Sequence, residues 1–242
     1  MDNHPEGLKN IATFTVLPAG EFSQWLRGTQ ASLRSGNGQA DVPCGSCKGC
    51  CRSSMFIHIK PEETQTLERI PRALLFPAPG LPRGHMLMGY SDRGQCPMLI
   101  DDRCSIYEVR PQTCRDYDCR AFAATGVAPD RQVQPEIAQR VSEWAFDYEN
   151  EAGREQHRIV KEAATFLEEN RSLFPLGSLP TFPVQLALLA VQVSALFSSL
   201  KASVHDASTN ANAAIARDLF AAMSKARGNP GECTSDCGYG SS

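Results

Sequence analysis

The sequence predicts an α+β protein, in which a small irregular cysteine-rich module with short strands packs with an N-terminal helix and a C-terminal helical region. Two observations support this prediction. Eight of the ten cysteines lie between positions 44 and 119, in a stretch rich in proline and turn residues. Apolar side chains then recur at helical spacing as far as position 227. We therefore expect an N-terminal helix and loop at 1–40, a cysteine-cluster module at 41–126, a helical region at 127–228 and a disordered tail at 229–242.

The first expected helix covers residues 19–34. Phe22, Trp25 and Leu26 follow helical spacing, and Gly36 ends the pattern. Because one face of this helix is apolar, we expect it to pack on the cysteine module. The glycine-rich loop that follows leads the chain to Cys44.

The module is expected to contain only short elements. These are strands at 55–60, 86–90 and 96–100, a short helix at 61–67, and another that carries Cys114 to Cys119. Prolines exclude regular structure between 71 and 84. A turn at 101–103 allows Cys96 and Cys104 to point at one centre. Residues 120–134 are expected to be a connector.

The helical region begins at Pro135. Its first two stripes consist of Ile137, Val141, Trp144 and Tyr148, and of Ile159, Val160, Ala163, Phe166 and Leu167. The uncharged run at 184–200 contains five polar side chains and is shorter than the roughly 20 apolar residues of a spanning helix, so we expect a buried helix and no membrane span. A last helix is expected at 208–227, with Gly228 as its stop. In the tail, Cys233 and Cys237 are interpreted as incidental cysteines.

Composition and charge limit the possible partners. The chain has 242 residues, of which 42% are hydrophobic and 21% charged, as in globular proteins. A formal net charge of −3 gives no reason to expect nucleic acid, whose binders usually carry a basic excess. Residues 1–6 are polar and lack the features of a secretory signal, so we expect a cytoplasmic protein. In that reducing compartment, clustered cysteines hold metal more often than they form disulfides.

The cysteine spacing predicts a metal site. The candidate ligands are Cys44, Cys47, Cys50, Cys51, Cys96, Cys104, Cys114 and Cys119. Thiolates select zinc or an iron–sulfur cluster. Structural zinc sites usually take separated Cys pairs, whereas the triplet at 44, 47 and 50 is typical of a 4Fe–4S cluster, which we therefore favour over zinc. Two tetrahedral zinc sites remain open.

Cys51 departs from the ferredoxin pattern because it follows Cys50 directly. Neighbouring side chains in an extended backbone point to opposite sides. One of these two cysteines is therefore expected to serve a second centre or to remain a buried free thiol.

Other residues near the cluster have weaker signals. His58 and His85 could replace a cysteine as ligand, although a structural role is expected for each. Arg110 and Arg115 could compensate thiolate charge, or pair with acidic neighbours such as Asp116. Tyr107 is expected in the core.

The motifs resemble a known family. The run Cys44-x2-Cys47-x2-Cys50-Cys51, the segment that begins Cys96-Pro97-Met98-Leu99, and the segment from Cys104 through Arg110-Pro111 to Cys114-Arg115 are similar to the zinc- or iron-chelating CxxCxxCC domain, also known from YkgJ-type proteins. Flagellin lysine N-methylases carry a similar module. The resemblance covers residues 44–119 and implies metal chelation.

The sequence thus predicts a protein that binds an iron–sulfur cluster or zinc, with a possible protein partner and no nucleic acid. The alternative is a protein-modifying enzyme similar to lysine N-methylases. No recognisable loop for S-adenosylmethionine supports that alternative, and no catalytic residue is assigned.

Overall fold

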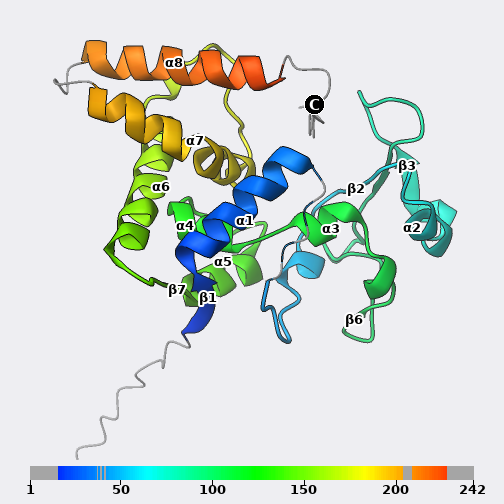
Figure 1. Ribbon diagram of the computed structural model, residues 1–242. Helices are drawn as coiled ribbons and strands as arrows, with labels where there is room; N and C mark the ends of the chain where they lie inside the picture. The colour runs from blue at the N-terminus through cyan, green and yellow to red at the C-terminus, as the bar shows by residue number, and fades with distance from the viewer. Residues whose placement is uncertain (1–15, 37, 39, 41, 204–208, 228–242) are drawn as a thin grey trace, which may run out of the picture.

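The computed structural model describes residues 16–36, 38, 40, 42–203 and 209–227 (Figure 1). The fold is mixed α+β, as predicted, with the long helices and the strands β1 (Leu17–Glu21) and β7 (Trp144–Asp147) on one side and the other short strands, with α2 (Thr64–Arg69) and α3 (Gln112–Asp116), on the other. The predictions for Gly228, for the tail at 229–242 and for its two cysteines lie outside the described residues.

The described elements follow in chain order. They are β1 (Leu17–Glu21), α1 (Phe22–Ser35), η1 (Gly49–Arg52), β2 (Ile57–Ile59), α2 (Thr64–Arg69), η2 (Arg72–Leu74), β3 (Leu75–Pro77), β4 (Met86–Met88), β5 (Leu99–Ile100), β6 (Arg103–Cys104), η3 (Tyr107–Val109), α3 (Gln112–Asp116), α4 (Arg120–Thr125), α5 (Pro135–Glu143), β7 (Trp144–Asp147), α6 (Glu151–Glu169), η4 (Arg171–Leu173), α7 (Pro183–Ser203) and α8 (Thr209–Arg227). The η elements are 3₁₀ helices.

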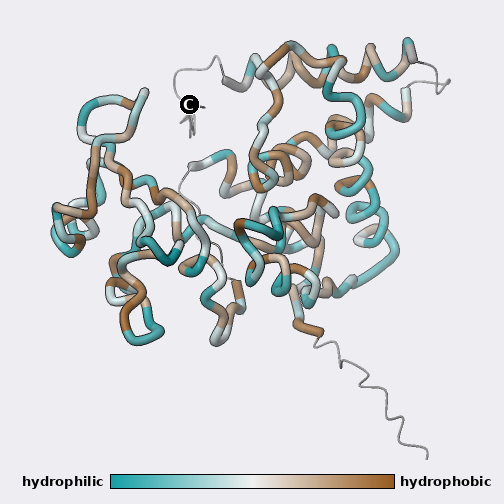
Figure 2. Tube along the Cα trace, turned by 180° about the vertical axis from the view of Figure 1, so that it is seen from behind, coloured by the Kyte–Doolittle hydropathy of each residue, from teal (hydrophilic) through white to brown (hydrophobic). Residues whose placement is uncertain are grey.

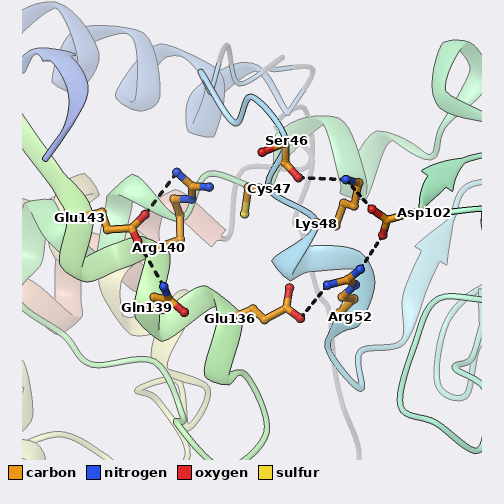
Figure 3. Close-up of a pocket in the computed structure, with 9 residues that line it drawn as sticks. All are labelled: Ser46, Cys47, Lys48, Arg52, Asp102, Glu136, Gln139, Arg140 and Glu143. Carbon is orange, nitrogen blue, oxygen red and sulfur yellow. Dashed lines mark hydrogen bonds and ion pairs between the residues drawn. The ribbon is translucent and has the colours of Figure 1, made fainter. Parts of the chain in front are cut away.

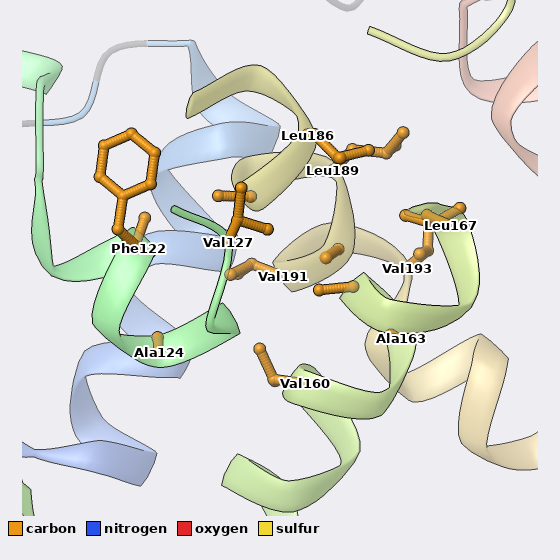
Figure 4. Close-up of a cluster of buried hydrophobic side chains, with 14 of the residues drawn as sticks. Phe122, Ala124, Val127, Val160, Ala163, Leu167, Leu186, Leu189, Val191 and Val193 are labelled. Atoms are coloured by element: carbon orange, nitrogen blue, oxygen red, sulfur yellow. The ribbon is translucent and has the colours of Figure 1, made fainter. Parts of the chain in front are cut away.

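The larger hydrophobic core is built by the helices. Side chains of α1, α4, α6, α7 and α8 form it, and Figure 4 shows Phe122, Val160 and Val191 among its buried members. Long hydrophobic stretches run through this part of the chain in Figure 2. α1 packs against α6 and α7, rather than mainly on the cysteine module as expected. It contacts the end of that module where Trp25 donates to Asp118.

α7 lies in the middle of this core, as predicted. Leu186, Ala187, Ala190 and Val191 are buried, and α6 is its main neighbour. α7 is the one described helix that is long and apolar enough to cross a membrane. Its packing against the other helices instead favours a core helix.

Two elements of the helical side differ from the prediction. The stripe through Trp144 and Tyr148 is not helical, because α5 ends at Glu143 and β7 pairs in parallel with β1. Trp144 and Phe146 point inward while Ala145 and Asp147 are exposed, which is the period of a strand. The expected connector at 120–134 begins with α4, which Gly126 ends at a φ of 78°.

The smaller core belongs to the cysteine-rich side. Ile57, Ile59, Met88, Met98 and Ile106 are among its buried residues. They lie on and around a three-stranded antiparallel sheet with the order β2-β4-β3. The prediction that prolines exclude regular structure from 71 to 84 is wrong, because β3 lies there. β3 is an edge strand, where a proline costs no ladder hydrogen bond on the open side.

The remaining short elements differ from prediction mainly in length. Of the strand expected at 96–100, only β5 at its end is extended, and it pairs with β6. Asp101 and Asp102 form the turn between them with positive φ angles of 47° and 59°. The helix expected from Cys114 to Cys119 is divided, since α3 ends at Asp116 and Cys119 caps the start of α4.

Candidate metal centre

The eight predicted ligands lie where the two cores meet. All are free thiols; Cys119 is buried and the other seven are partly exposed. The structure sorts them into two groups. The first group consists of Cys44, Cys47, Cys50 and Cys119, and the second of Cys51, Cys96, Cys104 and Cys114.

The first group combines the 44–50 turn with the start of α4. The backbone N–H of Cys47 donates to the carbonyl of Cys44 at 3.0 Å, which closes the turn. The turn runs into η1, and η1 packs on α5 so closely that a Cβ at position 49 would lie 3.2 Å from the backbone nitrogen of Ile137. Gly49 therefore allows this approach. Trp144 donates its indole N–H to the Cys119 sulfur at 3.3 Å.

The thiols of the first group influence one another electrostatically. Burial raises the pKa of Cys50 well above that of an ordinary thiol, and the sulfurs of Cys119 and Cys44 are the next causes. Burial also raises the pKa of Cys119 to about 12, although the hydrogen bond from Trp144 opposes this shift. Burial raises the pKa of Cys44, with Cys47 as the next cause. These sulfurs are therefore close neighbours.

The second group is brought together by backbone pairing. The N–H of Cys96 donates to the carbonyl of Cys51 at 2.7 Å. Leu99 N–H donates to the Cys96 carbonyl, and Leu99 is paired with Cys104 across the β5–β6 hairpin. Cys114 lies on α3, and its side chain packs against the smaller core beside Cys96 and Cys104.

The pKa values of cysteines in the second group are also affected by neighbouring sulfurs of that group. Burial raises the pKa of Cys51 to about 11, and Cys96 and Cys104 are the next causes, ahead of Cys47. Burial raises the pKa of Cys114 to about 12, followed by the charges of Cys96 and Cys51. For Cys51 and Cys114, sulfurs of the second group thus have the largest influence after burial.

Hydrogen-bond donors surround several of the sulfurs. Arg140 and the N–H of Gly49 both reach the Cys47 sulfur, the latter at 3.5 Å. The backbone N–H groups of Met98 and Leu99 donate to Cys96 and oppose the rise of its pKa that burial causes. Such donors stabilise thiolates around a metal or cluster.

Tyr117 provides a further sign that the residues fit a sulfur-ligated centre. Its hydroxyl is buried and has no hydrogen-bond partner in the structure. Burial raises its pKa well above the usual value, and the charges of Cys50 and Cys119 are the next causes, so the hydroxyl lies beside these sulfurs. A buried hydroxyl without a partner is costly. A thiolate or cluster sulfide within reach would accept a hydrogen bond from this hydroxyl.

The candidate ligands lie in one region but do not have the geometry of a metal site. In the part of the chain that the structure describes, no group of three or more His, Cys, Asp and Glu side chains is arranged so that it could hold a metal ion as it stands. The raised pKa values of Cys44, Cys50, Cys51, Cys96, Cys114 and Cys119 favour neutral thiols. Metal binding would therefore require the ligating thiols to lose protons and to turn toward the metal. Their assignment as ligands stays a prediction.

The other candidates have different partners. His58 and His85 hydrogen-bond each other at 2.8 Å with stacked rings, which favours the structural role. Arg115 pairs with Glu63 at 3.7 Å rather than with the expected acidic neighbours. Arg110 lies over the ring of Tyr107, and its charge lowers the pKa of Cys114 against the effect of burial. Tyr107 is exposed, so its expected core position is wrong.

A polar cavity of about 560 Å³ opens beside Cys47 (Figure 3). Its charged lining residues are Lys48, Arg52, Asp102, Glu136, Arg140 and Glu143. Arg52 joins the two sides of the molecule, because it pairs with Asp102 after β5 and with Glu136 on α5. The sequence could not predict that these charged residues line one cavity, since they come from distant segments of the chain.

Asp118 and Arg120 flank Cys119 and were not singled out in the sequence. Their side chains form a buried ion pair at 2.8 Å. Asp118 also accepts from Trp25, and Arg120 donates to the carbonyl of Ala19. These bonds fix the position of Cys119 relative to α1 and β1. A pair of opposite charges on either side of a cysteine was the only available signal.

Comparison with known proteins agrees with the site. Residues 43–142 match the model of the CxxCxxCC family, which is described as a putative zinc- or iron-chelating domain. No curated protein and no solved structure gives a significant match. The matched segment begins before Cys44 and ends after Arg140, so it includes both cysteine groups and α5. Over this segment, which is rather less than half of its length, the chain is similar to the CxxCxxCC family, and the match supports metal binding in general.

Proposed function

We propose that this protein is an iron–sulfur protein in which the first group binds a 4Fe–4S cluster. The observation that carries the proposal is the geometry of that group: a tight turn supplies three thiols at steps of three residues, and Cys119 supplies a fourth from a distant segment. Four cysteines are the usual ligands of such a cluster, and a Cys-x2-Cys-x2-Cys run is a common source of them.

The surroundings support a cluster that carries a net negative charge. Trp144 donates to Cys119, and Arg140 and Gly49 donate to Cys47. Hydrogen bonds to sulfur raise the reduction potential of a cluster and hold its ligands in place. When bound, such a cluster supplies one-electron transfer.

The position of Cys47 supports exchange of electrons with a protein partner. Cys47 lines the polar cavity, whereas Cys119 is buried beneath Trp144. The Cys47 edge of the site is therefore nearer to solvent than the Cys119 edge. The cavity rim bears both signs of charge, which is typical of a polar contact surface and gives no preference for nucleic acid.

The test is to purify the protein without oxygen and to measure iron, acid-labile sulfide and zinc together. We expect a brown protein that absorbs at about 400 nm and holds iron and sulfide in equal amounts. Cys47→Ser should lose this absorption, and a double Cys233→Ser and Cys237→Ser variant is the matched control that should keep it. Colourless protein with stoichiometric zinc and no sulfide would refute the proposal.

A further inference from the structure

The two cysteine groups belong to different parts of the molecule. Cys119 is a member of the larger core, together with Trp144, which donates to it. Cys96, Cys104 and Cys114 pack against the smaller core. The groups therefore differ in their packing as well as in their neighbours.

The groups meet at one peptide bond, between Cys50 and Cys51. Both residues lie in η1, where successive side chains of a 3₁₀ helix point about 120° apart. The backbone here is helical rather than extended as expected, but the two side chains still leave it in different directions. Cys51 is held toward Cys96 by the backbone bond between them, while the preceding Gly49 lies against α5.

We propose that the domain holds two separate four-thiolate centres, one formed by the first group and one by the second. Four thiolates complete either a zinc site or a 4Fe–4S cluster, so each group is a full ligand set. The inference rests on metal binding from the proposed function but does not depend on which metal is bound. Each centre joins η1 to a different core.

A single shared centre fits the structure less well. It would leave four thiols unused, yet Cys96 is bonded to Cys51 through the backbone and packs with Cys104 and Cys114 against the smaller core, whereas Cys119 lies in the larger core. It would also have to take ligands from both cores at once. Arg52 already links the two sides by ion pairs at the surface, so the linkage needs no shared metal.

The neighbouring cysteines of η1 provide a matched pair of variants. Cys50→Ser and Cys51→Ser change adjacent residues of the same short element by the same atom. We expect two centres per wild-type chain and one in each variant, measured by iron, zinc and sulfide content of the full-length protein. The two variants should lose different centres, which hydrogen exchange can locate. Cys50→Ser should loosen α4 and its surroundings, and Cys51→Ser should loosen the β5–β6 hairpin and α3.

Wild-type stoichiometry decides the question even if a variant does not fold. One zinc ion or one cluster per chain would overturn the two-centre proposal while leaving the identity of the metal open. Two zinc ions per chain would support it and refute the iron–sulfur proposal instead. Full metal content in Cys51→Ser would overturn it as well. Cys119→Ser and Cys104→Ser repeat the comparison with one ligand from each core.

Discussion

Asp118 should contribute more to stability than any exposed acidic residue, because its carboxylate is buried and has several donors. It accepts from Trp25 at 2.9 Å and from the Arg120 side chain at 2.8 Å and 2.9 Å. Asp118→Ala leaves the Arg120 charge nearly buried, with the Ala19 carbonyl as its remaining partner. Removal of one member of a buried ion pair costs about 3–5 kcal/mol, so we expect a loss of that size in the free energy of unfolding.

Urea unfolding of metal-loaded protein measures this loss, with metal content checked in every variant because lost metal would lower stability by itself. Trp25→Phe removes one hydrogen bond to Asp118 and should lower the free energy of unfolding by only about 1 kcal/mol, in addition to any effect of changed packing. A double variant, Asp118→Ala with Arg120→Met, should be at least about 1 kcal/mol more stable than Asp118→Ala alone, because the unpaired charge is gone. Glu155→Gln, which disrupts an exposed ion pair, is the control with little effect. A cost below about 1 kcal/mol for Asp118→Ala would refute the reasoning.

Three other predictions concern single side chains and one ligand. Burial lowers the pKa of His157 to about 4, so the unfolded chain takes up its proton below about 6.5 while the folded chain does not. Stability should therefore fall by about 2–3 kcal/mol between pH 6.5 and 4, and His157→Gln should flatten that part of the pH profile; parallel profiles for the two proteins would contradict this. Tyr117→Phe removes the buried hydroxyl without a partner, so it should stabilise metal-free protein by about 1 kcal/mol and lower the reduction potential of loaded protein, as measured by redox titration. An unchanged potential would mean that the hydroxyl does not reach the cluster. S-adenosylmethionine should leave the melting temperature of loaded protein unchanged, and an upward shift would instead favour the methylase-like alternative.

The sequence predicted the helices best where apolar spacing is long. α7 and α8 lie within a few residues of their expected positions, because each has enough turns for its pattern to be clear. β7 was missed because Trp144 and Phe146 alternate over only four residues, directly after a helix whose spacing continues into them. Its partner β1 is distant in the chain, so no local signal marks the pairing.

In the candidate site too, contacts between distant segments could not be predicted from the sequence. The clustering of the eight cysteines along the chain was visible in the sequence, and the family was recognised from its resemblance to the motifs around them, which the family match supports. Their division into two groups was not, since it depends on the bond between Cys96 and Cys51 and on the packing of Cys119 under Trp144. Pairings of this kind arise only when the two cores have formed.

The parallel pairing of β1 with β7 affects the order in which the chain can fold during synthesis. Leu17 and Trp144 are partners, so the first strand leaves the ribosome 127 residues before the residue it pairs with. At 5–20 residues per second, this interval is roughly 6–25 s. The smaller core and the second group are complete once Cys114 has emerged, whereas Cys119 acquires its indole donor only when Trp144 follows. A nascent chain can therefore assemble its second cysteine group first, while its N-terminal strand has no partner yet.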